Sequence, residues 1–199
     1  MSIRQAAAAS TTVFWCVALP ARVMVYIHRY NSPLGWITEA SNGKYLTGLW
    51  FNGQKLPIGK MDFNYKEKEL PVFNETDRWL DAYFRGKVPD FIPPLFLESS
   101  EFCKTVWNSI LNIFYGKTAA YSEIAKKLAS NKNLDQMSAR AVGGAVGRNP
   151  ILLIVPCHRI IGVNGNLTGY SGGIERKIKL LEMEGVDING LFAPRTTAT

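Results

Sequence analysis

The sequence predicts an α+β fold, with short antiparallel strands in the first half of the chain and helices in the second. The first half alternates apolar runs with turn residues, including Asn42-Gly43, a dipeptide typical of tight hairpins. From Ser100 onward, apolar side chains instead recur at helical spacing between Ser and Gly residues typical of helix ends. Pro89, Pro93 and Pro94 mark a linker between the two patterns. We therefore expect domains at 24–97 and 98–190.

In the first half, strands are predicted over 25–28, 36–38 and 45–51. A helix is predicted over 76–84, capped by Asn74 or Thr76 and closed by Gly86. Residues 1–23 differ from the rest: an alanine-rich stretch precedes an apolar run too short to span a bilayer. We interpret them as an extension or disordered tail, with an export signal as the less favoured alternative. Residues 191–199 are expected to form a tail, of which 194–199 should fray.

In the second half, Ser100 is expected to start a helix that ends by Gly116 and buries a set of apolar side chains. That set comprises Phe102, Val106, Trp107, Ile110, Ile113 and Phe114. Ser122 and Ser138 are expected to cap two short helices, 123–129 and 139–146, joined by a polar loop. This pattern predicts a helix-turn-helix. A final helix is predicted over 174–184 with Ile178 and Leu181 facing inward.

Five consecutive aliphatic residues, 151–155, predict a buried strand that ends at Pro156 and presents Cys157 and His158. Neighbours in an extended chain point to opposite sides, so we expect a water to link the thiol and the imidazole. His158 and Arg159 are expected to lower the pKa of the Cys157 thiol. The alternative is that Cys157 is an inert buried side chain, because cysteine is among the most buried residue types.

Two further features allow a structural or a functional interpretation. Gly143 and Gly144 should each cost the second short helix about 1 kcal/mol relative to alanine. This loss of helix stability could be compensated either by close packing against another helix or by the close approach of a nucleic acid. Glu184 lies in the last turn of the final helix, where the macrodipole disfavours anions; it is either functional or simply solvated.

Composition narrows the possible functions. The 199 residues are 47% hydrophobic and 20% charged, as in ordinary globular proteins, with a net charge of +7. Lys and Arg exceed Asp and Glu by five within residues 100–199, whereas 24–99 is balanced. This favours a polyanionic partner for the second half, although a modest excess also serves solubility. Three cysteines without a CxxC spacing and two histidines indicate no disulfide framework and no metal site, in keeping with a reducing cytoplasm.

Six motifs resemble those of the O6-alkylguanine-DNA alkyltransferases in order and spacing. They are Tyr121-Ser-Glu-Ile-Ala, Ala139-Arg-Ala-Val-Gly-Gly-Ala, Arg148-Asn-Pro, Val155-Pro-Cys-His-Arg-Ile-Ile-Gly, Gly169-Tyr-Ser-Gly-Gly and Leu180-Leu-Glu-Met-Glu-Gly. The resemblance implies a small ribonuclease H-like domain followed by a mainly helical, winged-helix-like domain with the helix-turn-helix. It also implies direct-reversal DNA repair. In that reaction the methyl group of O6-methylguanine, and of O4-methylthymine, passes once and irreversibly to Cys157, with no cofactor or metal.

The same resemblance implies roles for individual residues. Cys157 would be the nucleophile, His158 its base through a water, Glu184 the group that orients His158, and Asn149 a structural support. Arg140 would replace a base rotated out of the helix. Other DNA contacts would come from Tyr121, Ser122, Ser138, Ala139, Gly143 and Gly144. The pocket for the alkylated base would be lined by Val146, Pro156, Ile160, Tyr170 and Ser171. The implied partner is double-stranded DNA, bound through its minor groove by a monomer without membrane association.

Two other functional classes stay open at this stage. A cysteine hydrolase could use Cys157, His158 and Glu184 over many turnovers, but the sequence identifies no oxyanion hole. A DNA-binding regulator would use only the helix-turn-helix. Transfer of a labelled methyl group to Cys157, in at most one equivalent, distinguishes the alkyltransferase from both.

Overall fold

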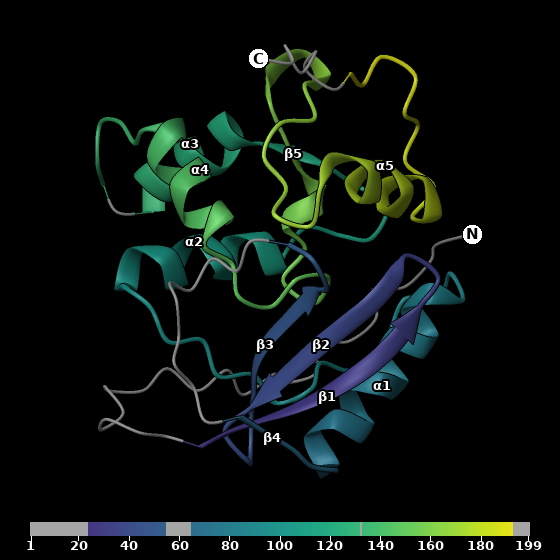
Figure 1. The fold of residues 1–199 in the computed structure, drawn as a ribbon. Coiled ribbons are helices and arrows are strands. Elements are labelled where there is room, and N and C mark those ends of the chain that lie inside the picture. The colour runs from purple at the N-terminus through teal and green to yellow at the C-terminus, as the bar shows by residue number, and fades with distance from the viewer. Residues whose placement is uncertain (1–23, 55–64, 132, 193–199) are drawn as a thin grey trace, which may run out of the picture.

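The computed structural model describes residues 24–54, 65–131 and 133–192 and has the α+β architecture that the sequence predicts. A sheet with one helix forms the lower half of the molecule in Figure 1, and the other helices form the upper half. The expectations for residues 1–23 and 193–199 lie outside the described residues. None of the described helices is long and apolar enough to cross a membrane.

The sheet domain contains β1 (Val25–Ser32), β2 (Gly35–Ser41), β3 (Leu46–Phe51) and β4 (Tyr65–Glu67), in the order β3-β2-β1-β4. The first three strands pair antiparallel and confirm the predicted strands, each of which lies within them or overlaps them. β4 instead runs parallel to β1. Gly35 has a φ of +106°, a conformation that glycine tolerates best, and it closes the tight turn between β1 and β2.

Helix α1 (Pro71–Phe84) belongs to the sheet domain and begins at Pro71 rather than at Thr76. A proline fits the first helical turn because its fixed φ is helical and that turn needs no N–H bond. Thr76 lies inside the helix, where its hydroxyl donates to the carbonyl of Val72 at 2.8 Å. The predicted caps at Asn74 and Thr76 are therefore wrong.

Within its described residues, the helical domain contains four α-helices and a short parallel strand pair. These are α2 (Glu101–Leu111), α3 (Tyr121–Asn131), α4 (Ala139–Gly147), α5 (Ile174–Met183), β5 (Ala119–Ala120) and β6 (Ile160–Ile161). Ser100 and Ser138 cap α2 and α4 as predicted, each accepting from a main-chain N–H of the first turn. The consecutive helices α3 and α4 pack together as the predicted helix-turn-helix.

Other local predictions for this domain need correction. Ser122 is not a cap, because α3 already begins at Tyr121. Phe114 is 81% exposed, since α2 ends at Leu111 and the chain has turned away from the core by then. Ile178 is only half-buried, whereas Leu181 is fully buried as expected.

The aliphatic run 151–155 is buried, but it is not a strand. Only Ile151 forms a bridge, to Leu49. The rest is a compact turn in which Val155 N–H donates to the carbonyl of Ile151 and Leu153 has a φ of +66°. Apolar composition predicts burial, and the chain can satisfy its buried N–H and C=O groups through turns as well as through a sheet. The strand prediction is therefore wrong in conformation and right in burial.

This turn is attached to the sheet domain. Leu49 N–H donates to the carbonyl of Pro150 at 2.9 Å, and Leu152 N–H donates to the carbonyl of Leu49 at 2.9 Å. The start of the turn therefore lies along the outer edge of β3 and is hydrogen-bonded to it. Near the C-terminus, Phe192 exchanges main-chain hydrogen bonds with Gly165 and Leu167, so this residue of the expected tail is held against the helical domain.

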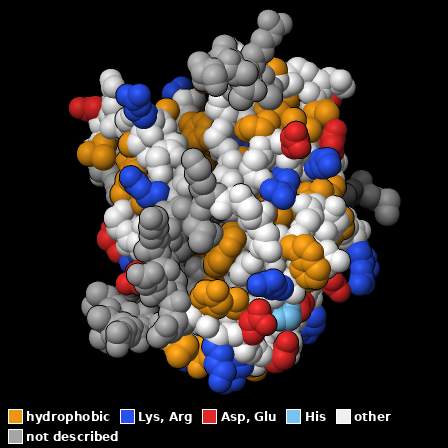
Figure 2. Space-filling view, viewed as in Figure 1, with side chains coloured by type: hydrophobic (Ala, Val, Ile, Leu, Met, Phe, Trp, Pro, Cys, Tyr) orange, Lys and Arg blue, Asp and Glu red, His pale blue; other side chains and the backbone are white. Residues whose placement is uncertain are grey.

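Charged side chains of both signs are interspersed on the face seen in Figure 2. The basic excess of the second half is therefore not gathered into one large patch on that face.

Candidate active site

Cys157 opens a single 3-10 turn, Cys157–Arg159, directly after Pro156. Its side chain is buried, with 2% exposed, and the sulfur accepts a hydrogen bond from Asn149 Nδ2 at 3.2 Å. Because the chain turns here, the expectation of an extended segment at Cys157 and His158 is wrong.

Asn149, just after the end of α4, is bonded to the buried turn formed by residues 151–155. It is buried, its Nδ2 donates to the carbonyl of Val155 at 2.8 Å, and its Oδ1 accepts from the N–H of Ile151 at 3.0 Å. The side-chain amide of Asn149 thus binds both ends of the 151–155 turn and also donates to the Cys157 sulfur. These bonds are consistent with the structural support that the resemblance implies for Asn149.

Glu184, the C-cap residue of α5, is the centre of a buried polar cluster. Its carboxylate accepts from His158 Nε2 at 2.7 Å, from Tyr83 Oη at 2.8 Å and from Arg159 Nε at 2.8 Å. Gly116 N–H donates to it at 3.2 Å. Burial alone would raise its pKa, but the bonds from His158 and Arg159 lower the pKa of Glu184 to about 2. Arg159 thus offsets the unfavourable helix dipole, and the solvated alternative for Glu184 is wrong.

His158 is completely buried, and burial lowers its pKa, so the neutral imidazole is favoured. With Nε2 against the Glu184 carboxylate, we assign the proton to Nε2. Nδ1 then carries the free lone pair, and it has no hydrogen-bond partner among the described residues. A neutral imidazole with an available lone pair next to Cys157 is equipped to accept a proton.

The expected lowering of the Cys157 pKa is wrong. Burial raises the pKa of this thiol to about 11, although the Asn149 hydrogen bond and the charge of Lys177 act in the opposite direction. Arg159 does not activate the sulfur, because its guanidinium binds Glu184 and the carbonyl of Ile113. At rest, Cys157 is therefore a protonated thiol.

Lys177 is a site residue that the sequence analysis missed. It is fully buried, and its Nζ donates to the carbonyls of Ile160 and Thr168. Burial lowers its pKa to about 8, whereas the nearby Cys157 raises it. The available signal was its position between Ile174 and Leu181 on the apolar stripe of α5, where lysine is rarely buried.

Two tyrosines and a glycine-rich loop surround the sulfur. Tyr121 Oη donates to the carbonyls of Thr168 and Gly169 at 3.3 and 3.4 Å, and burial raises its pKa to about 12. The Tyr170 ring packs edge-on against His158, with ring centroids 6.2 Å apart. The other expected pocket residues differ in burial: Val146, Pro156 and Ile160 are buried, and Ser171 is half-buried.

The exposed face of α4 is almost flat. Ala141, Gly144 and Gly147 occupy its middle, with the exposed Arg140 and Arg148 at its two ends. Among the described residues, none outside the backbone of α4 itself comes within 4 Å of a Cβ placed on Gly144, so helix packing does not explain this glycine. A Cβ placed on Gly143 would lie 3.7 Å from the Tyr121 ring, which puts the face beside the cysteine site. Of the other expected DNA contacts, Ser138 is exposed, and Ser122 and Ala139 are half-buried.

Family models match both domains. Residues 25–97 match the ribonuclease-like domain of 6-O-methylguanine DNA methyltransferase, and residues 101–186 match its DNA-binding domain.

Curated relatives match over most of their length. The methylated-DNA–protein-cysteine methyltransferase of Methanosarcina acetivorans is 42% identical over 161 residues, which is 81% of this chain and 99% of that protein. The protein of the same name from Mycobacterium leprae is 40% identical, covering 81% and 93%. Among solved structures, Mycobacterium tuberculosis OGT in complex with DNA aligns with a TM-score of 0.70 at 38% identity, covering 85% of this chain and 99% of that one. The chain therefore belongs to the 6-O-methylguanine DNA methyltransferase family, which repairs DNA by transferring the alkyl group directly to a protein cysteine.

Proposed function

We propose that Cys157 is the residue that accepts the alkyl group from O6-methylguanine in DNA. The observation that carries this proposal is the contact between Glu184 and His158 Nε2, which leaves Nδ1 of His158 without a partner among the described residues, one residue after the buried Cys157. Cys103, the other cysteine that the described residues contain, lies in α2 outside this arrangement.

The chemistry follows from the resting protonation states. The Cys157 thiol gives its proton to His158 Nδ1 through a water, and Glu184 stabilises the imidazolium that forms. The thiolate attacks the methyl carbon in line with the bond to O6, so that the S–C bond forms as the C–O bond breaks. The released guanine takes up the proton. The thioether product has no group beside it that removes the methyl, so each molecule acts once.

Lys177 and Tyr121 assist this step. The Lys177 ammonium offsets the negative charge that develops on the sulfur, as its influence on the Cys157 pKa indicates. Tyr121 lies between Gly143 of α4 and the loop carbonyls, where it can contact an incoming nucleotide.

DNA would lie against α4 through the minor groove. Its small central residues allow close approach, and Arg140, one turn before Gly143 and Gly144, would occupy the space of the extruded base. Arg148 at the far end of the same face would contact phosphate.

The decisive experiment uses duplex DNA carrying O6-methylguanine labelled in the methyl group. We expect the label on the tryptic peptide that contains Cys157, with a plateau at one equivalent of protein. Cys157→Ala should abolish transfer, whereas the matched Cys103→Ala variant should retain it. Label on Cys157→Ala protein, or continued turnover beyond one equivalent, would refute the proposal.

A second experiment tests the role of Arg140. Arg140→Ala should slow transfer from duplex DNA about 100-fold and transfer from free O6-methylguanine hardly at all, since the free base needs no extrusion. Equal slowing on both substrates would count against base flipping.

A further inference from the structure

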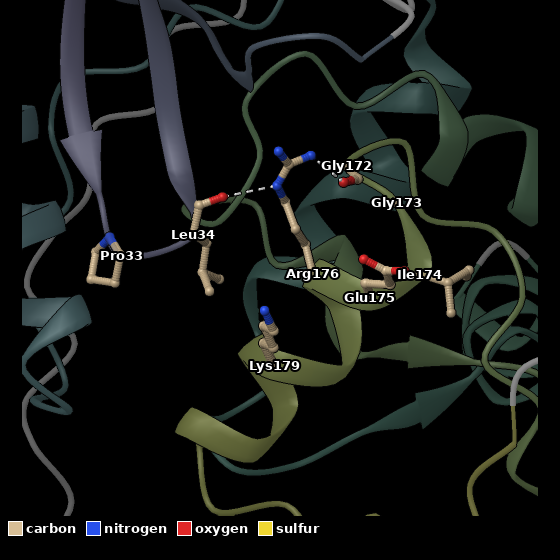
Figure 3. A pocket seen from close by; sticks show the side chains of 8 residues that line it. All are labelled: Pro33, Leu34, Gly172, Gly173, Ile174, Glu175, Arg176 and Lys179. Carbon is tan, nitrogen blue, oxygen red and sulfur yellow. Dashed lines mark hydrogen bonds between the residues drawn. The ribbon is translucent and has the colours of Figure 1, made fainter.

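Arg176 of α5 joins the two domains beside the cysteine site (Figure 3). Its Nε donates to the carbonyl of Leu34, in the turn between β1 and β2, at 3.0 Å. Its Nη1 donates to the carbonyl of Gly172, in the glycine-rich loop, at 3.0 Å. The guanidinium also lies over the ring of Phe51 in β3, 4.7 Å from the centroid. The side chain is therefore held at three points, two of them in the sheet domain.

The loop that Arg176 holds forms one wall of the cysteine site. A Cβ on Gly172 would lie 2.5 Å from the Tyr170 ring, so the main chain at this position sits directly on that ring. The ring in turn packs edge-on against His158. The position of Gly172 thus fixes the position of Tyr170, and Tyr170 limits the space beside His158 and Cys157.

Gly172 is buried, and Phe51 of β3 also packs against it: a Cβ on Gly172 would lie 3.2 Å from the Phe51 ring. Gly169 and Gly173 have φ values of +71° and +94°, and a segment with three glycines in five residues bends easily. A cavity of about 570 Å³ lies between this loop, the start of α5 and the turn between β1 and β2. The Phe51 contact is apolar and has no fixed direction, so the hydrogen bonds of Arg176 set where the loop stands relative to that open space.

We propose that Arg176 is a positioning residue that sets the width of the alkyl pocket by fastening the glycine-rich loop to the sheet domain. This rests on the proposed function of Cys157 and adds a determinant of alkyl-group selectivity. With the loop fastened, Tyr170 leaves room for a small alkyl group and holds it in line with the sulfur. When the loop is not held by Arg176, it can move toward the open cavity. The wider pocket favours transfer of larger alkyl groups and aligns a methyl group less well with the sulfur.

The test compares Cys157 alkylation rates for duplex DNA carrying O6-methylguanine or O6-benzylguanine. For Arg176→Ala we expect methyl transfer to fall about tenfold, because misalignment of reacting atoms is costly, and the benzyl-to-methyl rate ratio to rise. Arg176→Lys, which keeps a cationic donor, should recover part of the methyl rate. Lys179→Ala is the matched control: Lys179 is exposed on the same helix and lines the same cavity, so both rates should stay at the wild-type value.

The outcomes separate the inference from the proposed function. If wild-type protein transfers neither group to Cys157, the proposed function fails. If wild type transfers both and Arg176→Ala keeps the wild-type ratio, only the role of Arg176 fails. An equal fall in both rates, with a lowered melting temperature, would show a purely structural residue and would also overturn the inference.

Discussion

At the scale of single residues, Glu184 determines how the site responds to acid. Its side chain is fully buried, and its folded pKa is about 2 against an ordinary value of 4.5. A carboxylate with a lowered folded pKa stabilises the protein above its unfolded pKa, and this contribution disappears as the pH falls through the folded pKa.

We therefore expect Glu184 to contribute about 3 kcal/mol of stability above pH 4.5, lost as the pH falls from 4.5 to 2. Urea unfolding between pH 2 and pH 6 measures it. Glu184→Gln should lower stability at pH 7 by about 3 to 5 kcal/mol, because Arg159 would be left buried without its counter-charge. An unchanged pH slope in the variant would contradict the assignment.

Lys177 also acts through its charge. Its pKa of about 8 keeps the ammonium mostly protonated at pH 7. Lys177→Met should therefore slow methyl transfer about tenfold at pH 7. The gap to wild type should narrow above pH 8, where wild type loses that charge. Stopped-flow rates from pH 6 to pH 9 test this, and a constant gap across the range would exclude an electrostatic role.

At the scale of elements, the glycines of α4 make this helix less stable and leave its exposed face flat. Glycine in a helix interior costs about 1 kcal/mol of helix stability relative to alanine. No described residue packs into the space that a side chain at Gly144 would occupy.

Gly144→Ala should accordingly raise the free energy of unfolding by about 1 kcal/mol. Gly144→Leu should fold normally and bind duplex DNA at least tenfold more weakly, because the side chain would stand between the helix and the groove. Asn108→Leu, an exposed position on α2, is the control for added surface hydrophobicity. Fluorescence anisotropy gives the affinities, and wild-type affinity in Gly144→Leu would remove α4 from the interface.

At the scale of the whole molecule, the sheet domain completes the active site of the helical domain. Tyr83 of α1 donates to Glu184 at 2.8 Å, and Leu49 of β3 holds the turn that precedes Cys157. The two domains therefore share one set of buried hydrogen bonds.

Tyr83→Phe should slow methyl transfer severalfold and lower stability by about 2 kcal/mol, because it removes a buried hydrogen bond to a charged group. DNA affinity should not change, since α4 is untouched. Tyr115→Phe is the matched control, because it removes a tyrosine bond to the main chain of Met183 near the same carboxylate. If both variants react at the same rate, Tyr83 has no particular link to the site.

The sequence by itself determined the fold class and the helix-turn-helix with its Ser138 cap, which follow from local spacing and capping chemistry. It also singled out Cys157, His158, Asn149 and Glu184 as candidate site residues, with roles implied by the resemblance of their motifs to those of a known family.

Only the tertiary structure decided the form of the 151–155 turn, the raised pKa of Cys157, and the contacts that Lys177, Tyr83 and Arg176 make. Each depends on contacts between residues far apart in the chain, or on how completely a group is removed from water. An apolar run such as 151–155 can form its main-chain hydrogen bonds in a turn or in a strand. A cationic side chain binds whichever partner the fold brings close to it. Neither the conformation of the run nor the partner of the cation can therefore be predicted from the order of residues.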